Sequence, residues 1–421
     1  MTPCHRRRTR AASVPAALLL LLAGFSLSRS IAEGFPDFVS FLGAYGRADA
    51  TSRPELARAF IQEQQARGGF PAIQPDGSVI FFYAGRGDER DVRVVGDFRT
   101  RSSNDVYWSD AGEPMSRAVP DGAVFFKRLT FENDARIDYA FRVDGEHALD
   151  PLNPRVVESG MVDKACELVM PGYRPSPAAT PRASVPRGEL RVVDEAWATP
   201  KVTVYLPAGY DPSKRYPVIY TADGSAWIKI IGLPAILDNL IADHAIEPVL
   251  AVLIDPTDNR SRWYHYDPAY LTYLEKVVEY VDRQYSTRSR ADQRLHVGTS
   301  SGGRATLYVG FERPGLFRDL AMLSPSLTGP PHYLEPYFAG SRRPDKNLRI
   351  WLSAGTYEEY IHRDTRTLER YFRKVGVKTK TIYTHEGHSF GAWRTLTPDM
   401  LEYFFPAHAD RDERSAAPEA P

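Results

Sequence analysis

One stretch of the chain decides the fold, RLHVGTSSGGRATLY at residues 294–308. A short apolar run leads into it, the pattern Gly-x-Ser-x-Gly lies at its centre, and a helix-compatible run follows. This order is typical of a nucleophile elbow, where a strand turns sharply into a helix and presents one serine at the tip. Gly298 and Gly302 flank Ser300 because side chains there would collide with the neighbouring strand and helix. Ser300 is therefore the candidate nucleophile, although a chain with 30 glycines can contain this short pattern by chance.

An acid and a base have to follow the nucleophile. Residues 349–355 form an apolar run ending in a turn, and Glu358 and Glu359 come directly after it. A carboxylate there can orient an imidazole, and the spacing favours Glu358, but glutamate is also common in the first turn of an ordinary helix. After the next predicted strand, a loop holds His385 and His388, which completes the order serine, acid, histidine of α/β-hydrolases. The two histidines could instead be a zinc pair, but no helix or third ligand cluster accompanies them.

The region around the elbow alternates between predicted strands and helices, the pattern of a mostly parallel sheet covered on both faces. Predicted strands lie at residues 201–206, 216–220, 249–254, 320–323, 349–353 and 379–383, and predicted helices at 233–242, 270–284, 305–311, 364–375 and 397–404. The fold class is therefore α/β, with an α/β-hydrolase fold over residues 189–406. Such a sheet binds ligands beyond the carboxyl ends of its strands, so site residues are expected in the loops that follow the strands.

The 421 residues are too many for one ordinary domain, and the earlier part of the chain divides into shorter segments. Residues 33–69 show helical spacing and are predicted to be a helical lead-in. Residues 70–173 are predicted to form a small β-sandwich, because turn residues separate the short β-rich runs at 78–83, 92–96, 123–131, 137–143 and 165–170. Residues 174–188, rich in Pro, Ala and Ser, are predicted to be a linker, and the charged residues 407–421 a disordered tail.

The first 32 residues are predicted to be a signal peptide. Arginines at positions 6, 7, 8 and 10 precede an apolar run centred on residues 16–22, and Ser30 and Ala32 supply small residues for cleavage near Ala32. A membrane anchor is the alternative, but the run is shorter than the ~20 apolar residues of a spanning helix. We therefore expect a periplasmic or secreted protein that keeps no stable membrane anchor. Cys166 then remains alone and is expected to pack rather than react.

Composition argues against one class of partner. The chain has 53 basic and 53 acidic side chains, and its first 32 residues hold five arginines and no acid, which leaves 48 basic and 53 acidic side chains in the remainder. No basic stripe interleaved with aromatic residues occurs, so nucleic acid is not expected as a partner. No cofactor and no metal site are predicted.

The β-rich region resembles a known module. The segments VVGDF at 94–98, YAFRVDG at 139–145 and DPLNP at 150–154 are similar to the early-set immunoglobulin-like domain of glycogen-binding proteins and of enterochelin esterases. Sugar-binding members usually carry a tryptophan soon after the Gly-Asp-Phe turn, where this chain has RTRSS at 99–103 and Trp108 arrives late. The resemblance therefore implies a module that packs on the catalytic domain and shapes its cleft, rather than one that binds carbohydrate.

Residues 201 to about 406 resemble the enterochelin esterase and esterase D group of serine esterases. The matching segments are YTADGSAW at 220–227, GTSSGG at 298–303, FERPGLF at 311–317, GTYE at 355–358 and GHSFGAWR at 387–394. In that family the acid lies three residues after the first glycine and the base follows the second, which implies Glu358 and His388 as the partners of Ser300. Many members have Asp as the acid, and near relatives often have Gln or His in place of Thr299. These departures concern the substrate more than the reaction class.

The resemblance implies a serine carboxylic-ester hydrolase that forms an acyl-enzyme on Ser300 and then hydrolyses it. Two backbone N–H groups are expected to stabilise the oxyanion. One is that of Ser301, and the other comes from an upstream turn, with Ala226 or Trp227 preferred. The Asp223-Gly pair in that turn could equally make only a tight turn.

Arg260, Arg262, Trp263 and Tyr264 follow the predicted strand at 249–254 on the same rim. Arginines beside aromatic rings suit a phenolic or anionic ester, such as a catecholate siderophore or a feruloyl sugar. Alternatively, this is a solvated loop in which Trp263 merely packs on the next helix. The expected partner is thus a small-molecule ester. A feruloyl or acetyl esterase acting on plant polysaccharide, a mycolyl-type acyltransferase and a non-catalytic binding protein are the other candidate functions.

Overall fold

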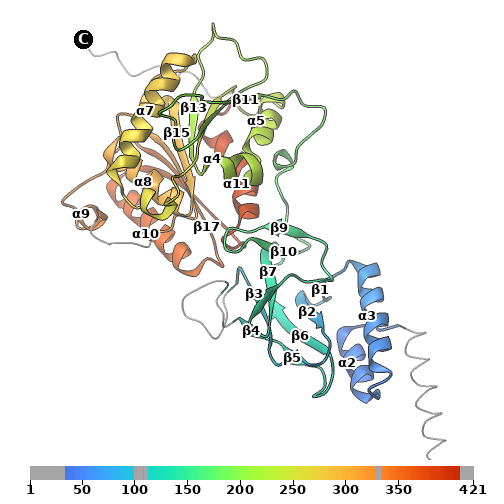
Figure 1. Cartoon of the computed structure of the whole chain (residues 1–421). Helices are drawn as coiled ribbons and strands as arrows, with labels where there is room; N and C mark the ends of the chain where they lie inside the picture. Colours follow the sequence, from blue (N-terminus) through green and yellow to red (C-terminus); the bar gives the residue numbers. More distant parts are fainter. Residues whose placement is uncertain (1–33, 99–107, 109–111, 328–332, 408–421) are drawn as a thin grey trace, which may run out of the picture. The chain divides into compact units, whose positions relative to one another are not determined.

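The computed structural model describes residues 34–98, 108, 112–327 and 333–407 (Figure 1). The predicted signal peptide, the tail after residue 407 and the segment at 99–103 lie outside these ranges. The chain divides into two compact units, of which the first holds the residues up to Val94 with Glu113–Phe131 and Phe141–Pro154. The second holds Val95–Gly112, Glu132–Ala140 and Arg155–Pro421. The predicted boundaries at 70 and 173 stay a prediction, because this division runs through the β-rich region.

The first unit is built on aromatic packing. Helices α2 (Phe38–Arg47) and α3 (Arg53–Arg67) lie within the predicted helical lead-in. Phe41 of α2 and Phe60 of α3 stack with their ring centroids 4.3 Å apart, and both contact Phe82 on a sheet. That sheet is antiparallel, in the order β1 (Ala72–Ile73), β2 (Ser78–Ala84), β6 (Val124–Thr130) and β5 (Ser116–Arg117).

A further sheet contains antiparallel pairs and has the order β4 (Glu113–Pro114), β3 (Val92–Gly96), β7 (Arg136–Val143), β10 (Lys164–Val169) and β9 (Val156–Glu158), with β8 (Glu146–Ala148) paired to β7. The five runs predicted as strands in the β-rich region correspond to β2, β3, β6, β7 and β10 within one residue at each end. Cys166 of β10 is fully buried, as expected for a packing residue. The antiparallel pairing agrees with the predicted sandwich, while its immunoglobulin-like assignment stays a prediction.

The second unit contains an eight-stranded sheet in the order β11, β12, β14, β13, β15, β16, β17, β18. Pairing is parallel from β14 to β18, and β12 pairs antiparallel with both β11 and β14. The strands span Glu189–Val192 (β11), Val202–Leu206 (β12), Val218–Ala222 (β13), Leu250–Ile254 (β14), Arg294–Thr299 (β15), Asp319–Leu323 (β16), Arg349–Gly355 (β17) and Lys378–Thr384 (β18). Six of them match predicted strands within two residues at each end, β15 is the run that enters the elbow, and β11 was not predicted.

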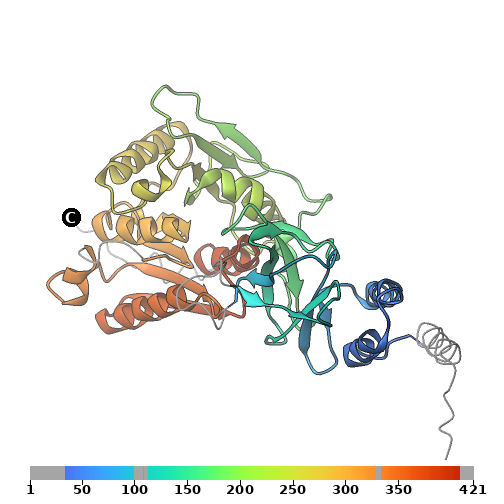
Figure 2. The same cartoon turned by 60° about the horizontal axis from the view of Figure 1, so that its bottom comes forward.

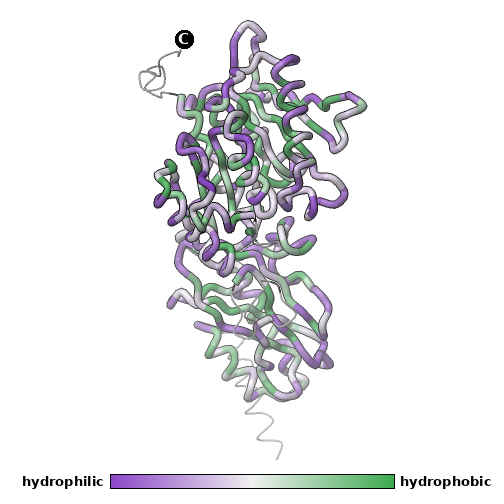
Figure 3. Tube along the Cα trace, turned by 90° about the vertical axis from the view of Figure 1, so that its left-hand side faces the viewer, coloured by the Kyte–Doolittle hydropathy of each residue, from purple (hydrophilic) through white to green (hydrophobic). Residues whose placement is uncertain are grey.

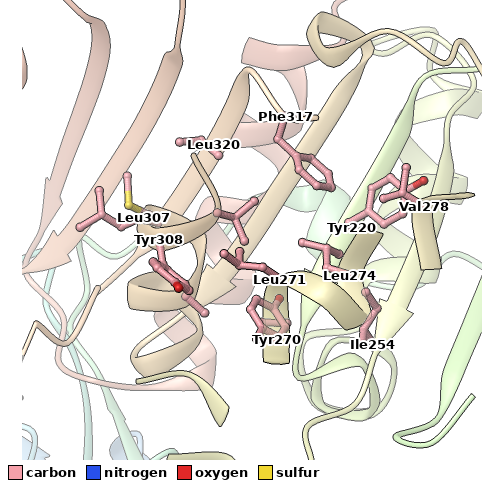
Figure 4. Close-up of a cluster of buried hydrophobic side chains, with 14 of the residues drawn as sticks. Tyr220, Ile254, Tyr270, Leu271, Leu274, Val278, Leu307, Tyr308, Phe317 and Leu320 are labelled. Atoms are coloured by element: carbon pink, nitrogen blue, oxygen red, sulfur yellow. The ribbon is translucent and has the colours of Figure 1, made fainter. Parts of the chain in front are cut away.

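Helices cover both faces of this sheet (Figures 1 and 2). Buried side chains of α7 (Pro268–Gln284), α8 (Ser301–Glu312) and α10 (Glu359–Val375) form one apolar cluster with the sheet, and those of α5 (Leu233–Ala242) and α11 (Phe390–Phe404) form another. In the first cluster, Tyr220 and Ile254 of the sheet lie beside Leu274 and Val278 of α7 (Figure 4). Hydrophobic residues follow the inner strands, and hydrophilic residues are concentrated in outer loops and turns (Figure 3). This layering is the predicted α/β architecture.

Three helices begin four or more residues earlier than predicted. Helix α8 starts at Ser301 rather than 305, α10 at Glu359 rather than 364, and α11 at Phe390 rather than 397. In α11, Pro398 lies inside the helix and Ser389 is the N-cap, whose side chain accepts a hydrogen bond from the Ala392 N–H at 3.2 Å. Each of the three helices therefore begins within two residues of a predicted catalytic residue, Ser300, Glu358 or His388.

Short elements complete the second unit. They are α4 (Gly224–Ala226), the π-helical η2 (Trp227–Ile231), α6 (Arg260–Trp263), α9 (Glu335–Phe338), and the 3₁₀ turns η1 (Pro177–Ala179) and η3 (Ala291–Gln293). Among the described residues, no single helix is long and apolar enough to cross a membrane, and the segments Gly224–Ile231 and Leu233–Ala242 pass that test only as a pair bent by 67°.

Candidate active site

Ser300 lies at the tip of a sharp turn between β15 and α8. Its backbone has φ 54° and ψ −121°, a region that costs a non-glycine residue about 1–3 kcal/mol. The turn is held by hydrogen bonds from the Ser300 N–H to the Leu323 carbonyl and from the Ser326 N–H to the Ser300 carbonyl, both 3.0 Å. A Cβ at Gly298 would lie 2.2 Å from the carbonyl oxygen of Gly302, so only glycine fits there. The strained serine is thus fixed from both sides.

His388 links the serine to a carboxylate. Its Nε2 lies 2.9 Å from Ser300 Oγ, and its Nδ1 lies 2.6 Å from Glu358 Oε1. Because an ionised carboxylate only accepts hydrogen bonds, the imidazole donates through Nδ1 and its Nε2 is left to accept the Ser300 proton. The ring also packs edge-on against Trp393, with centroids 5.0 Å apart. This is the relay geometry of a serine nucleophile and its general base.

Glu358 is completely buried, and its second oxygen is also occupied. Oε2 accepts hydrogen bonds from Ser324 Oγ at 2.8 Å and from the Gly355 N–H at 2.6 Å. Ser324 Oγ in turn accepts a bond from Trp393 Nε1 at 3.0 Å. Glu359, the residue not preferred, begins α10 and is exposed to solvent. The carboxylate therefore has a fixed orientation toward His388.

His385, the other histidine of the loop, has a different partner. Its Nδ1 lies 2.6 Å from Asp134 Oδ1, and its side chain is 37% exposed. The two histidines therefore bond to different carboxylates. Of the loop's two candidates, the structure brings only His388 to Ser300.

Comparison with known proteins places this arrangement in a family. Residues 198–404 match the family model described as "Putative esterase". This part of the chain, which holds Ser300, Glu358 and His388, belongs to that esterase family. It is an ester hydrolase. Among its relatives are an uncharacterized protein of Bacillus subtilis, YjcH, 27% identical over 38% of this chain and 68% of that protein, and an endo-1,4-beta-xylanase/feruloyl esterase of Xylanibacter ruminicola, 26% identical over 48% of this chain but only 29% of that protein.

A solved structure supports the fold of the esterase. The ferric enterobactin esterase of Salmonella typhimurium aligns with a TM-score of 0.66 over 79% of this chain and 95% of that chain. The two are 18% identical in sequence, so this similarity concerns the α/β-hydrolase fold. The coverage also shows that the likeness extends beyond residues 198–404.

The predicted oxyanion donors of the esterase differ in availability. Ser301 is the first residue of α8, so its N–H has no partner within the helix. The N–H groups of Ala226 and Trp227 instead both donate to the Asp223 carbonyl, at 2.9 and 3.2 Å. The preference for Ala226 or Trp227 as the second donor therefore does not fit this turn. Among the described hydrogen bonds, the Gly224 N–H has no acceptor.

The residues predicted to bind substrate are mostly engaged with the protein itself. Arg260 donates to both carboxylate oxygens of Asp223, each at 2.7 Å. Tyr264 is buried, and its hydroxyl accepts the Asp223 N–H at 2.9 Å. Trp263 packs edge-on against Tyr270 of α7, with centroids 5.6 Å apart, as the alternative interpretation expects. Arg262 differs from these three because its side chain is 81% exposed, with a weak 3.7 Å ion pair to Asp267.

Some residues around the triad geometry were not predicted. Ser324 follows β16 and has φ 49°, a strained value that no local signal indicates. Trp393 belongs to the motif at 387–394, but its hydrogen bond to Ser324 spans 69 positions. Spatial neighbours of this kind are found only in the folded chain.

One cavity of the esterase lies away from this site. It measures about 310 Å³ and is lined by Pro186, Tyr205, Ala208, Gly209, Asp238, Ile241 and Ala242. None of the predicted site residues lines it. The functional interpretation therefore depends on the hydrogen-bonded chemistry at Ser300 and not on the presence of a cavity.

Proposed function

We propose that the protein is an exported serine carboxylic-ester hydrolase that acts through Ser300, His388 and Glu358 by way of an acyl-enzyme. The observation that carries this proposal is the continuous hydrogen-bonded chain from Ser300 Oγ through the imidazole to the buried carboxylate, with its 2.9 and 2.6 Å links. A strained serine with a positive φ adds support, because strain at one residue is typical of functional sites.

In the proposed reaction, Ser300 Oγ attacks the ester carbonyl as His388 Nε2 takes its proton. Glu358 stabilises the imidazolium and keeps Nδ1 protonated toward itself. The imidazolium then gives the proton to the leaving alcohol, and a water activated by the same nitrogen hydrolyses the acyl-enzyme. The first proton transfer uses the hydrogen bond already formed between Ser300 and His388, and Glu358 is already bonded to the same ring.

The oxyanion of each tetrahedral intermediate needs backbone donors. The N–H of Ser301 is the first, and we assign the second to Gly224, since the following amides of its turn are already hydrogen-bonded. One such donor is worth about 3 kcal/mol in related sites. The positive end of α8 adds to the favourable potential at this position.

Two substrate classes are supported by the names of similar proteins. A solved structure of similar fold is a ferric enterobactin esterase, and one relative is named as a xylanase/feruloyl esterase. Arg262 is the exposed cation available to an anionic or catecholic substrate on this rim, since Arg260 is neutralised by Asp223. We propose a catecholate siderophore ester as the first class and a feruloyl or acetyl ester of polysaccharide as the second.

Export and the nature of the β-rich region belong to the same proposal. The signal-like residues 1–32 support a periplasmic or secreted enzyme. The antiparallel sheets support an early-set immunoglobulin-like module. N-terminal sequencing of secreted protein tests the first claim, and a mature start well away from Ala32 would contradict the predicted cleavage.

The decisive test is hydrolysis of p-nitrophenyl acetate by the wild type, Ser300→Ala and His388→Ala. We expect turnover by the wild type alone, and equal turnover by Ser300→Ala would refute the role of Ser300. A panel of ferric and free catecholate siderophores, feruloyl sugars and acetyl sugars then identifies the substrate class. Equal, slow hydrolysis of all of them would refute an aromatic substrate. Adding trehalose or glycerol and looking for acylated acceptor distinguishes hydrolysis from mycolyl-type transfer.

A further inference from the structure

The loop that carries His388 is bonded to a buried arginine, Arg136, which lies 252 positions upstream at the start of β7. Arg136 and the loop belong to the same compact unit. The Arg136 N–H donates to the His385 carbonyl at 3.1 Å, and the two segments form a parallel β-bridge at Glu386. Its guanidinium Nη1 donates to Ser389 Oγ at 2.8 Å. Arg136 therefore holds the loop on both sides of His388.

The hydrogen bond from Arg136 to Ser389 affects His388 because Ser389 fixes the backbone next to it. Its Oγ also caps α11 by accepting the Ala392 N–H, and its own N–H donates to the Gly387 carbonyl at 3.0 Å. The latter bond closes a three-residue turn with His388 at its centre. The backbone of His388 is thus fixed by the position of Ser389, and Ser389 is bound by Arg136.

The guanidinium is itself locked in place. Nε donates to Glu167 at 2.6 Å, and Nη2 lies 2.8 Å from Asp138. Arg136 is 3% exposed, so three separate acceptors surround a buried planar fork. A lysine ammonium, which is one point charge on a flexible chain, cannot reproduce these three directions at once.

The glycines of the histidine motif fit these upstream residues. A Cβ at Gly391 would lie 2.1 Å from the guanidinium carbon of Arg136, and a Cβ at Gly387 would lie 2.0 Å from the Cβ of Asp97. The Asp97 N–H donates to the Asp138 carbonyl at 2.9 Å, so it is fixed beside the same strand. The pattern Gly-His-Ser-x-Gly therefore leaves room for Arg136 and Asp97.

We propose that Arg136 is a positioning residue of the esterase, which sets the place of the His388 ring by holding Ser389 and the first turn of α11. This inference rests on the proposed role of His388 as the base. Arg136 does not touch the reacting atoms, since it acts through the backbone on either side of the histidine. A displacement of about 1 Å at a reacting group can cost on the order of 100-fold in rate, so loss of this contact should lower kcat.

The test compares Arg136→Lys, Ser389→Ala and Gly391→Ala with the wild type in p-nitrophenyl acetate hydrolysis. We expect kcat to fall roughly 10- to 100-fold in each, with KM changed by less than about twofold, because the proposed effect is on the position of the base. Folded fraction is measured by circular dichroism, and kcat is expressed per folded molecule. Gly391→Ala keeps Arg136 but pushes its guanidinium aside, while it favours the helix.

A control variant at another buried arginine and a double-mutant cycle distinguish a positioning role of Arg136 from a general loss of stability. Arg294 is also buried and also donates to a carboxylate, Asp282, but it begins β15, and none of the hydrogen bonds described for its side chain reaches the histidine loop. Arg294→Lys should therefore change stability and leave kcat per folded molecule at the wild-type value. In an Arg136→Ala background, Gly391→Ala should cause no further loss, since the side-chain atoms that its Cβ would meet are gone.

Three results would show that Arg136 does not position His388. An unchanged kcat in Arg136→Lys, an equal fall in Arg294→Lys, or additive effects of Arg136→Ala and Gly391→Ala would overturn the inference. If Arg136→Ala does not fold, Ser389→Ala and Gly391→Ala test the same contact with Arg136 in place. Full activity in His388→Ala would instead overturn the proposed function, whereas an inactive His388→Ala with fully active Arg136 and Ser389 variants would overturn only the positioning role.

Discussion

Glu386 should make the esterase less stable as the pH rises. Burial, reinforced by the charges of Asp138 and Glu358 and opposed by Arg136 and the Tyr173 hydroxyl, raises the pKa of Glu386 from 4.5 to about 7. Its folded pKa is above its unfolded value, so its stabilising contribution is complete below pH 4.5 and is lost as the pH rises through 7. A pKa difference of about 2.5 corresponds to about 3 kcal/mol, most of it between pH 5 and pH 8.

Glu386→Gln removes this dependence, because the amide is neutral at both pH values and is nearly the same size. We expect the variant to unfold at a higher urea concentration than the wild type at pH 8, with a free energy of unfolding about 3 kcal/mol larger. At pH 5 the two should unfold at nearly the same urea concentration. Esterase activity and tryptophan fluorescence, measured as functions of urea concentration, report the unfolding of the unit that contains Ser300. Glu195→Gln is the matched control, since Glu195 is exposed. An equal advantage of Glu386→Gln at both pH values, or none at pH 8, would refute the reasoning.

Three further substitutions test the site and its support. Glu358→Gln should lower kcat by roughly 10³–10⁴ with little change in KM, as in related triads, and a loss below tenfold would contradict its role. Gly298→Ala should destabilise the fold by about 1–3 kcal/mol in thermal melts, because its Cβ meets the Gly302 carbonyl, whereas Gly315→Ala, which meets nothing within 4 Å, should not. Burial lowers the pKa of His296 to about 3, so wild-type stability should fall as the pH drops below 6.5, and a His296→Gln variant should lose less between pH 6 and pH 4.

The nucleophile elbow was predictable because its constraints are local. Gly298 and Ser300 are separated by one residue, and the steric reason for the glycine acts across that same turn. Glu358 and His388 each follow a strand whose apolar pattern is clear in the sequence, so their places at the carboxyl edge of the sheet followed from the fold. Their choice over Glu359 and His385 depended on family spacing, and the contacts agree with it.

The rim residues were harder to predict because their partners lie far away in sequence. Arg260 resembled a substrate-binding cation, but its charge is satisfied by Asp223, 37 positions earlier. The same Asp223 has a left-handed backbone with φ 63°, and its carbonyl accepts the amides of Ala226 and Trp227 that were expected to face the oxyanion. A single residue in an uncommon conformation thus changed two predictions, and residue type alone does not reveal that conformation.

The histidine motif shows where local reasoning ends. Gly387 and Gly391 were recognised as family positions, but neither has a positive φ, so their conformational freedom does not explain them. Their cause is close approach, by Asp97 at one glycine and by the Arg136 guanidinium at the other, both more than 250 positions earlier in the chain. The two glycines of this short motif are therefore required by two side chains that are distant in sequence. If Arg136 were replaced by a small residue, the requirement for glycine at 391 should disappear, and alanine there should be tolerated with no further loss of kcat.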